Sequence, residues 1–200
     1  YLRQNMPSKA LRAASEAMEI NPHELISLEE LGKVQAALND DENALKTFRQ
    51  ALYLQPGNKD IVDQIHEVLN RADDPQGKTR DFFTEMADEC PTVREIQDRC
   101  IRLLVSQKRF EEAENRLHHV VVTWPEDNHS RVARLNLLVR IDRIDEALTE
   151  AIRMIRDENS LTAVSALLIA EAMERHGDRA CAIQMLEIYN GHNSADEGIY

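Results

Sequence analysis

The sequence predicts an all-α fold built from repeated helical hairpins, and its composition and two periodic sets of residues support this prediction. Aromatic residues make up 4% of the 200 residues, and glycine and proline number six each. Ala, Leu, Glu, Asp and Arg dominate, a mixture that favours helix over strand. A small residue that opens a helical run recurs at intervals of 34, 69, 34 and 35 residues, at Ala10, Ala44, Ala113, Ala147 and Ala182. Prolines recur at intervals of 34, 35 and 34 residues, at Pro22, Pro56, Pro91 and Pro125. Because the wide interval divides again at Thr79, both landmarks give one period.

The second of these units, residues 25–58, carries the most complete pattern. Large apolar, small and turn-forming residues follow one another in the order Leu28, Leu31, Gly32, Ala44, Phe48, Ala51 and Pro56. The small residues allow two helices to approach closely, and the large ones fill the space between units. The proline ends the second helix because it has no amide proton and disfavours helix in the residue before it. The polar run Asn39, Asp40 and Asp41 predicts a tight turn and an N-cap for the second helix.

This unit resembles the tetratricopeptide repeat, a helix-turn-helix unit of about 34 residues in which the same residue types stand at these offsets. Its one departure is Gln35, where the family usually has tyrosine. The resemblance implies a right-handed α-solenoid of about 5.5 repeats, with a concave surface lined mainly by the first helix of each pair. Another α-solenoid with divergent units would share this period, whereas a helical bundle would not explain prolines and alanines that stay in phase.

The other units match less fully. We expect a partial repeat over 1–24, repeats over 59–93, 94–127 and 128–162, a degenerate repeat over 163–196 and a tail over 197–200, all in one solenoid domain. Tyr1 falls where the family's first-helix tyrosine belongs. A turn over 73–77 takes up one extra residue in the third unit, and Gly177 with Asp178 supplies a turn and a cap in the last.

Charge and composition exclude several classes of function. The net charge of −12 argues against nucleic acid as a partner, because binding to a polyanion needs clustered Lys and Arg. No stretch approaches the ~18 apolar residues of a membrane span, and no signal peptide is visible. The three cysteines have no C-x-x-C spacing, which favours a reducing compartment and therefore a cytoplasmic location. A periplasmic or membrane-tethered location remains open if a longer precursor precedes Tyr1.

No residue pattern in the sequence indicates catalysis, a cofactor or a metal. Adjacent His118 and His119 point about 100° apart on a helix, and no third ligand stands one turn away on the same face. None of the cysteines has a local histidine partner, so none is assigned as a nucleophile. Glycine-rich phosphate loops and serine nucleophile motifs are also absent from the sequence. The sequence therefore predicts a protein that is not an enzyme.

The predicted function is a non-catalytic scaffold that binds a peptide or protein segment in the concave groove. Positions between the core residues of each first helix are the candidate groove residues, namely Glu29, Lys33, Asp63, Gln64, Glu67, Arg99, Arg102, Asn136 and Arg140. They are acidic early in the chain and more basic in its middle, a pattern that would orient a ligand of mixed charge or would merely be a solvated face. Two alternatives are a targeting arm of a larger enzyme, such as a glycosyltransferase or sulfotransferase, and a self-associating assembly scaffold.

Overall fold

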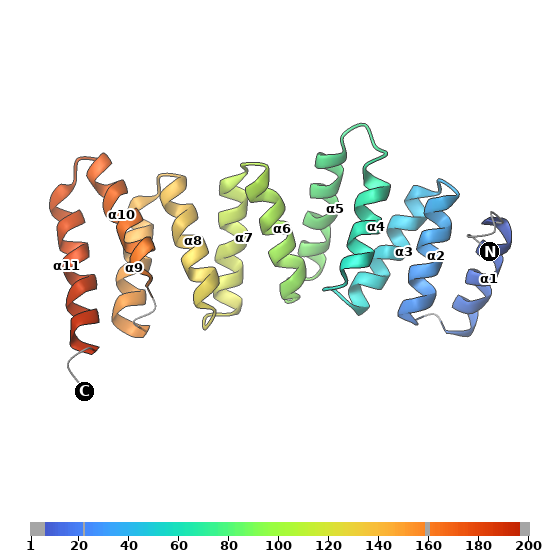
Figure 1. Cartoon of the computed structure of the whole chain (residues 1–200), viewed down its shortest axis with the longest axis horizontal. Helices are drawn as coiled ribbons and strands as arrows, with labels where there is room; N and C mark the ends of the chain where they lie inside the picture. Colours follow the sequence, from blue (N-terminus) through green and yellow to red (C-terminus); the bar gives the residue numbers. More distant parts are fainter. Residues whose placement is uncertain (1–6, 22, 159–160, 197–200) are drawn as a thin grey trace. The chain divides into compact units, whose positions relative to one another are not determined.

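The computed structural model describes residues 7–21, 23–158 and 161–196, and within them the chain forms α-helices joined by turns, with no strand (Figure 1). The predicted all-α fold is therefore confirmed. The helices are α1 (Pro7–Ile20), α2 (Leu25–Ala37), α3 (Asp41–Leu54), α4 (Lys59–Leu69), α5 (Pro75–Glu89), α6 (Arg94–Ser106), α7 (Phe110–Thr123), α8 (Asn128–Arg140), α9 (Ile144–Glu158), α10 (Ala163–Arg175) and α11 (Arg179–Asp196). Tyr1, Pro22 and the tail expected over 197–200 lie outside the described residues.

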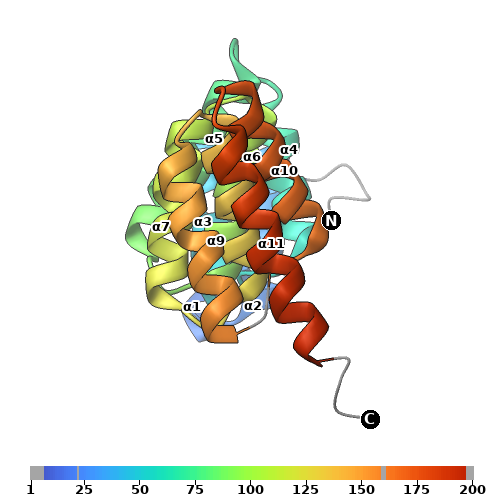
Figure 2. The same ribbon diagram turned by 90° about the vertical axis from the view of Figure 1, so that its left-hand side faces the viewer.

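The chain divides into two compact units, Tyr1–Cys100 and Ile101–Tyr200, and the boundary falls within α6. Inside each unit a helix packs mainly on its neighbours in the chain and on the helix two positions away, as α2 does with α4 and α8 with α10. The pair α10 and α11, for example, lies side by side in Figure 2. Contacts of such short range are typical of stacked helical hairpins, in which each hairpin completes its core against the next.

In the first unit, α2 and α3 approach each other closely at Gly32. A Cβ built on Gly32 would lie 2.5 Å from the ring of Phe48, so only glycine fits opposite this ring. Phe48, Ala44 and Ala51 have no exposed surface, and Leu28 on α2 is 1% exposed. The small and large residues of the best-matching unit therefore have the roles that their types predict.

The hairpin of α4 and α5 has a longer turn. Asp74 is the N-cap of α5, where its carboxylate accepts a hydrogen bond from the amide of Gly77 at 3.0 Å. Pro75 occupies the first helical position, where its missing N–H has no helical partner to lose. Thr79 is buried in the slot that small residues fill in the other units. The turn expected over 73–77 is therefore wrong at its end, because 75–77 already form the first turn of α5.

In the second unit, α8 to α11 share one apolar core. The most deeply buried side chains, each at most 1% exposed, are Leu135, Leu138, Ala147, Ala151, Met154, Ala166, Ile169 and Ala172. They recur at helical spacing on each element, as expected for helices that bury one face. Cys181, Leu186 and Tyr189 of α11 pack against this core from the side.

Four hairpin turns share one backbone conformation. Each places one residue in the left-handed region, with φ of 59° at Asn39, 61° at Lys108, 68° at Asp142 and 84° at Gly177. The amide of the next residue then donates to a carbonyl five residues earlier, at 2.9 Å for Asp40 to Gln35, Arg109 to Leu104 and Arg143 to Leu138, and at 3.0 Å for Asp178 to Met173. These hydrogen bonds satisfy carbonyls that the end of a helix leaves unpaired.

Side-chain caps differ between the turns. Asp40 stands at the predicted N-cap of α3, but its carboxylate accepts from the side chain of Asn43 at 2.9 Å and makes no cap hydrogen bond to the backbone. The N-cap hydrogen bond predicted for this turn is therefore wrong, because the side chain of Asn43 competes as a donor. Asp178 does cap α11, accepting from the amide of Cys181 at 3.1 Å. Gly177 and Asp178 form the turn and cap expected of them.

Helix ends follow the prolines. Helices α3, α5 and α7 end at Leu54, Glu89 and Thr123, each two residues before a proline. Because proline disfavours helix in the residue before it, these ends follow directly from the sequence. The last helix has no such signal, and α11 extends to Asp196. None of the described helices combines the length and the apolar character needed to cross a bilayer.

Candidate functional site

Five candidate groove residues of the first unit lie on α2 and α4, where they differ in how far their side chains are exposed to solvent. Asp63 and Glu67 are exposed, whereas Glu29, Lys33 and Gln64 are half-buried. The amide of Asn58 donates to Glu29 at 2.8 Å, which ties α2 to the N-cap of α4. Glu29 therefore already has a structural partner within the fold.

Lys33 also has a partner on its own helix. Its ammonium lies 3.0 Å from the carboxylate of Glu30, one turn earlier on α2. This is an exposed pair of a kind that contributes little to stability and that a ligand can displace at small cost. Lys33 and Glu30 therefore remain usable for binding, unlike Glu29.

A second group in the same unit brings α4, α5 and α6 together. The guanidinium of Arg99 lies 5.5 Å from the centroid of the Phe83 ring, close enough for a cation–π contact. The ring of His66 lies 6.0 Å from that of Phe83. Burial lowers the pKa of His66, the positive charge of Arg99 lowers it further, and Asp63 opposes both effects. Two predicted residues, Asp63 and Arg99, thus act on one histidine that the sequence did not single out.

The predicted groove residues of the second unit differ in their surroundings. Arg102 and Asn136 are exposed on α6 and α8. Arg140, at the end of α8, places its guanidinium 4.3 Å from the centroid of Phe110, the first residue of α7. That contact covers a half-buried aromatic ring, so Arg140 also contributes to packing.

The second unit contains a partly buried ion-pair network that the sequence did not predict. Glu114, whose side chain is 2% exposed, lies 2.8 Å from Arg134 and 2.7 Å from Arg143. Arg131, at 3% exposure, pairs with Glu150 at 2.9 Å. The network ties α7 to α8 and to the turn before α9. Its members are 19 to 29 residues apart in sequence, so no local pattern could have revealed them.

The cysteines and histidines form no reactive arrangement in the part of the chain that the structure describes. Burial raises the pKa of the Cys90 thiol, and a hydrogen bond with Asp178 raises that of Cys181. A raised pKa favours the neutral thiol over the nucleophilic thiolate. His118, His119 and His129 are exposed, and no group of three metal-binding side chains occurs among the described residues.

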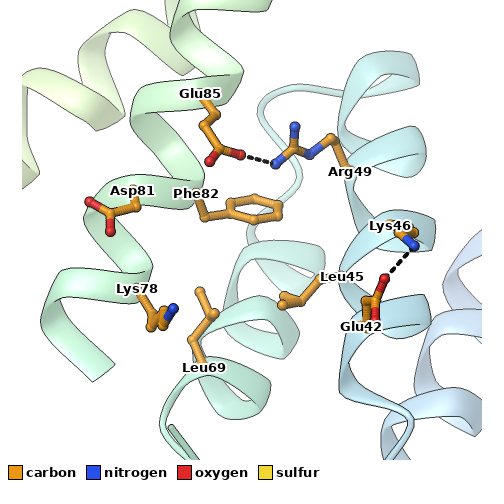
Figure 3. A pocket seen from close by; sticks show the side chains of 9 residues that line it. All are labelled: Glu42, Leu45, Lys46, Arg49, Leu69, Lys78, Asp81, Phe82 and Glu85. Carbon is orange, nitrogen blue, oxygen red and sulfur yellow. Dashed lines mark hydrogen bonds and ion pairs between the residues drawn. The ribbon is translucent and has the colours of Figure 1, made fainter. Parts of the chain in front are cut away.

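A hollow of about 480 Å³ lies between α3 and α5, on the second helices of the first unit (Figure 3). Leu45, Leu69 and Phe82 are its apolar residues, and three acidic and three basic side chains surround them. This hollow lies outside the candidate groove residues, all of which belong to first helices. One signal was available: Leu45 and Phe82 are large apolar residues placed directly beside the core positions Ala44 and Phe83.

Comparison with known proteins identifies the fold. No family model matches the sequence, and no curated protein matches it. Among solved structures, YrrB, a TPR protein with an unusual peptide-binding site, is 19% identical, with a TM-score of 0.52 over 92% of this chain and 93% of that chain. MamA MSR-1 is 14% identical, with a TM-score of 0.51 over 86% of this chain and 98% of that chain. MamA AMB-1 is 16% identical, with a TM-score of 0.51 over 88% and 93% of the respective chains. This chain therefore has the tetratricopeptide-repeat fold, an all-α solenoid of helical hairpins.

Proposed function

We propose that this chain is a protein-interaction scaffold that holds a peptide or protein segment against the exposed faces of its first helices. Support comes from the fold, which presents rows of helical faces rather than an enclosed reactive centre, and from the peptide-binding site of the similar protein YrrB. Nucleic acid is left out of the proposed partner classes because the net charge is −12.

The observation that carries the proposal is an acidic face on α4. Asp60, Asp63 and Glu67 are exposed at intervals of three and four residues, so they lie on one side of the helix. None of the three takes part in an ion pair with any residue that the structure describes, whereas Lys33 and Arg94 on the neighbouring first helices each pair with a carboxylate. Three unpaired carboxylates along about two helical turns favour a segment with basic residues at a similar spacing.

Arg99 sets one limit of this acidic face. Its guanidinium rests on Phe83 and lowers the pKa of His66, so its charge acts close to α4. A ligand carrying both signs would place its basic residues along α4 and a carboxylate toward Arg99. Lys33 on α2 offers a second cation, because its exposed pair with Glu30 can be displaced. The proposed ligand is therefore predominantly basic, with acidic residues at its ends.

The test is capture of partners by the whole 200-residue chain and by a charge-reversed variant. We expect Asp63→Lys with Glu67→Lys to lose at least tenfold in retained partner, because two attractive contacts become repulsive. The matched control reverses Glu111 and Glu187, two exposed glutamates on second helices. Circular dichroism establishes that both variants keep their helix content.

The two variants together decide the outcome. Equal loss in both would mean that net charge alone governs retention, and no loss in either would mean that the partner contacts another surface. Either result contradicts the proposal. A steep fall in retention between low and moderate salt is also expected, since the distance over which exposed charges act falls from about 30 Å at 0.01 M to about 8 Å at 0.15 M ionic strength.

A further inference from the structure

We propose that the hollow between α3 and α5 is a second docking site, which takes a short extended protein segment bearing an apolar side chain beside a carboxylate. This site lies on second helices and does not depend on the function proposed for the first helices. Its evidence is the shape of the hollow, its apolar residues and the distribution of charge around them (Figure 3).

The hollow has the form of a short groove between two helices. One side is the α3 face of Glu42, Lys46 and Arg49, spaced by four and three residues. The other is the α5 face that runs from Lys78 to Glu85. Seven residues of helix span about 10 Å, a length that accommodates about three residues of an extended chain. Its volume of about 480 Å³ suits a bulky side chain with its backbone.

The apolar part of the groove comes from three helices. Leu45 is half-buried on α3, Leu69 is buried at the end of α4, and Phe82 is 6% exposed on α5. Figure 3 shows these side chains directed toward the same space. The ring of Phe82 is fixed by an edge contact with Phe83 at 5.3 Å and by the guanidinium of Arg49 at 5.0 Å. An apolar side chain that enters the groove therefore meets a preformed surface, which lowers the cost of binding.

Salt bridges define one end of the groove. Arg49 lies 2.8 Å from Glu85 and 3.0 Å from Glu89, so it links α3 to α5 at that end. Tyr53 donates to Glu89 in the same cluster. On the α3 side, Lys46 pairs with Glu42 at 2.6 Å. Lys46 and Glu42 neutralise each other, whereas Arg49 faces two carboxylates, so this end of the groove has an excess of negative charge and disfavours an acidic ligand group.

Lys78 differs from these charged residues of the groove because it is not part of an ion pair with any described residue. It is exposed near the opposite end from the Arg49–Glu85 pair, as Figure 3 shows, and it makes no ion pair with any residue that the structure describes. Asp81, one turn further along α5, is paired with Arg80 at 2.8 Å. The groove therefore has an apolar centre and one uncompensated cation, and the complementary ligand has a bulky apolar residue next to an acidic one.

The experiment uses the whole chain labelled with ¹⁵N and the peptide acetyl-Gly-Glu-Leu-Glu-Gly-amide, which places a carboxylate on either side of the apolar residue. We expect amide chemical shifts to change along α3 and α5, around Leu45 and Lys78. Replacing both glutamates of the peptide by glutamine should weaken binding about two- to fivefold, as for loss of an exposed ion pair. Replacing its leucine by glycine should abolish the shifts.

Two variants of the protein make the assignment specific. Lys78→Glu should remove the preference for glutamate over glutamine and create one for a further peptide in which both glutamates are replaced by lysine. The control Lys59→Glu, which changes an exposed lysine on α4, should alter neither preference. Leu45→Ala should weaken binding of the glutamate and the glutamine peptide by the same factor. Alanine is a strong helix former, so α3 is kept. The proposal is overturned if the shifts are absent or lie on α2 and α4. It is also overturned if Lys78→Glu leaves the preference intact, or if the same amides shift with protein concentration alone, which would mean that a second copy fills the groove.

Discussion

Replacing Gly32 by alanine should destabilise the protein, although the same change inside a helix normally stabilises it. Alanine gains about 1 kcal/mol over glycine in a helix interior. At Gly32 the added Cβ would lie 2.5, 2.7 and 2.9 Å from three atoms of the Phe48 ring, which has no exposed surface into which to move. Overpacking of this kind costs about 1–3 kcal/mol, and a contact this short belongs at the upper end. We therefore expect a net loss of about 2 kcal/mol.

Urea unfolding followed by circular dichroism measures this effect, with Gly191→Ala as the matched control. Gly191 is also helical, but nothing lies within 4 Å of the position that its Cβ would take. The control should raise stability by up to about 1 kcal/mol. Phe48→Leu combined with Gly32→Ala should show a favourable coupling energy of about 1 kcal/mol, because the smaller side chain makes room. A gain for Gly32→Ala as large as that for Gly191→Ala would refute the close packing of α2 on α3.

Three further outcomes follow from buried and partly buried charges. Glu114→Ala should cost about 3–5 kcal/mol in urea unfolding, because it leaves Arg134, whose side chain is 12% exposed, without this carboxylate, whereas Glu146→Ala, which removes an exposed pair with Arg143, should cost less than about 1 kcal/mol. By NMR, the His66 imidazole should titrate below its ordinary pKa of 6.5, because folding favours its neutral form. Its contribution to stability is therefore present above pH 6.5 and is lost as the pH falls through the lower pKa of the folded state. Tyr53, whose pKa is raised to about 12 by burial and by its bond to Glu89, should ionise later than an unperturbed tyrosine in an ultraviolet titration, and Tyr53→Phe should remove that late step. Its contribution to stability is full below pH 10 and is lost as the pH rises toward 12. A midpoint for His66 at or above 6.5, or no late step in the parent protein, would contradict these assignments.

The repeat could be predicted from sequence because its signals are local. Small residues at fixed intervals, prolines after second helices and the Gly177 turn each act within a few residues of where they stand. The deep burial of Ala44 and Phe48 follows from such a pattern. The turn before α5 was predicted only in part, because Asp74 and Pro75 together are a strong helix start and α5 begins at Pro75, inside the turn expected over 73–77.

The candidate site was less predictable because side-chain partners depend on distant residues. No residue close to Glu29 in the sequence indicates that its carboxylate will accept a hydrogen bond from Asn58. Likewise, no residue close to Arg140 indicates that its guanidinium will lie over the ring of Phe110. The groove between α3 and α5 likewise needs Leu45, Leu69 and Phe82 from three helices. Periodicity predicts which way a residue faces, but the spacing between two helices, and what fills it, is decided by the fold as a whole.

The left-handed turn residues have a consequence for how such a chain can change over time. Three of the four are not glycine, and each of these three holds a conformation that costs an ordinary residue about 1 kcal/mol. Main-chain hydrogen bonds hold the turn conformation there. The side chain can therefore change during evolution, as long as other interactions offset that cost. Lys108 is the plainest case, since it lacks the short polar side chain that helps Asn39 and Asp142. Glycine at position 108 would relieve this backbone strain. The stability gained would allow the chain to tolerate destabilising mutations on the surfaces that select a partner.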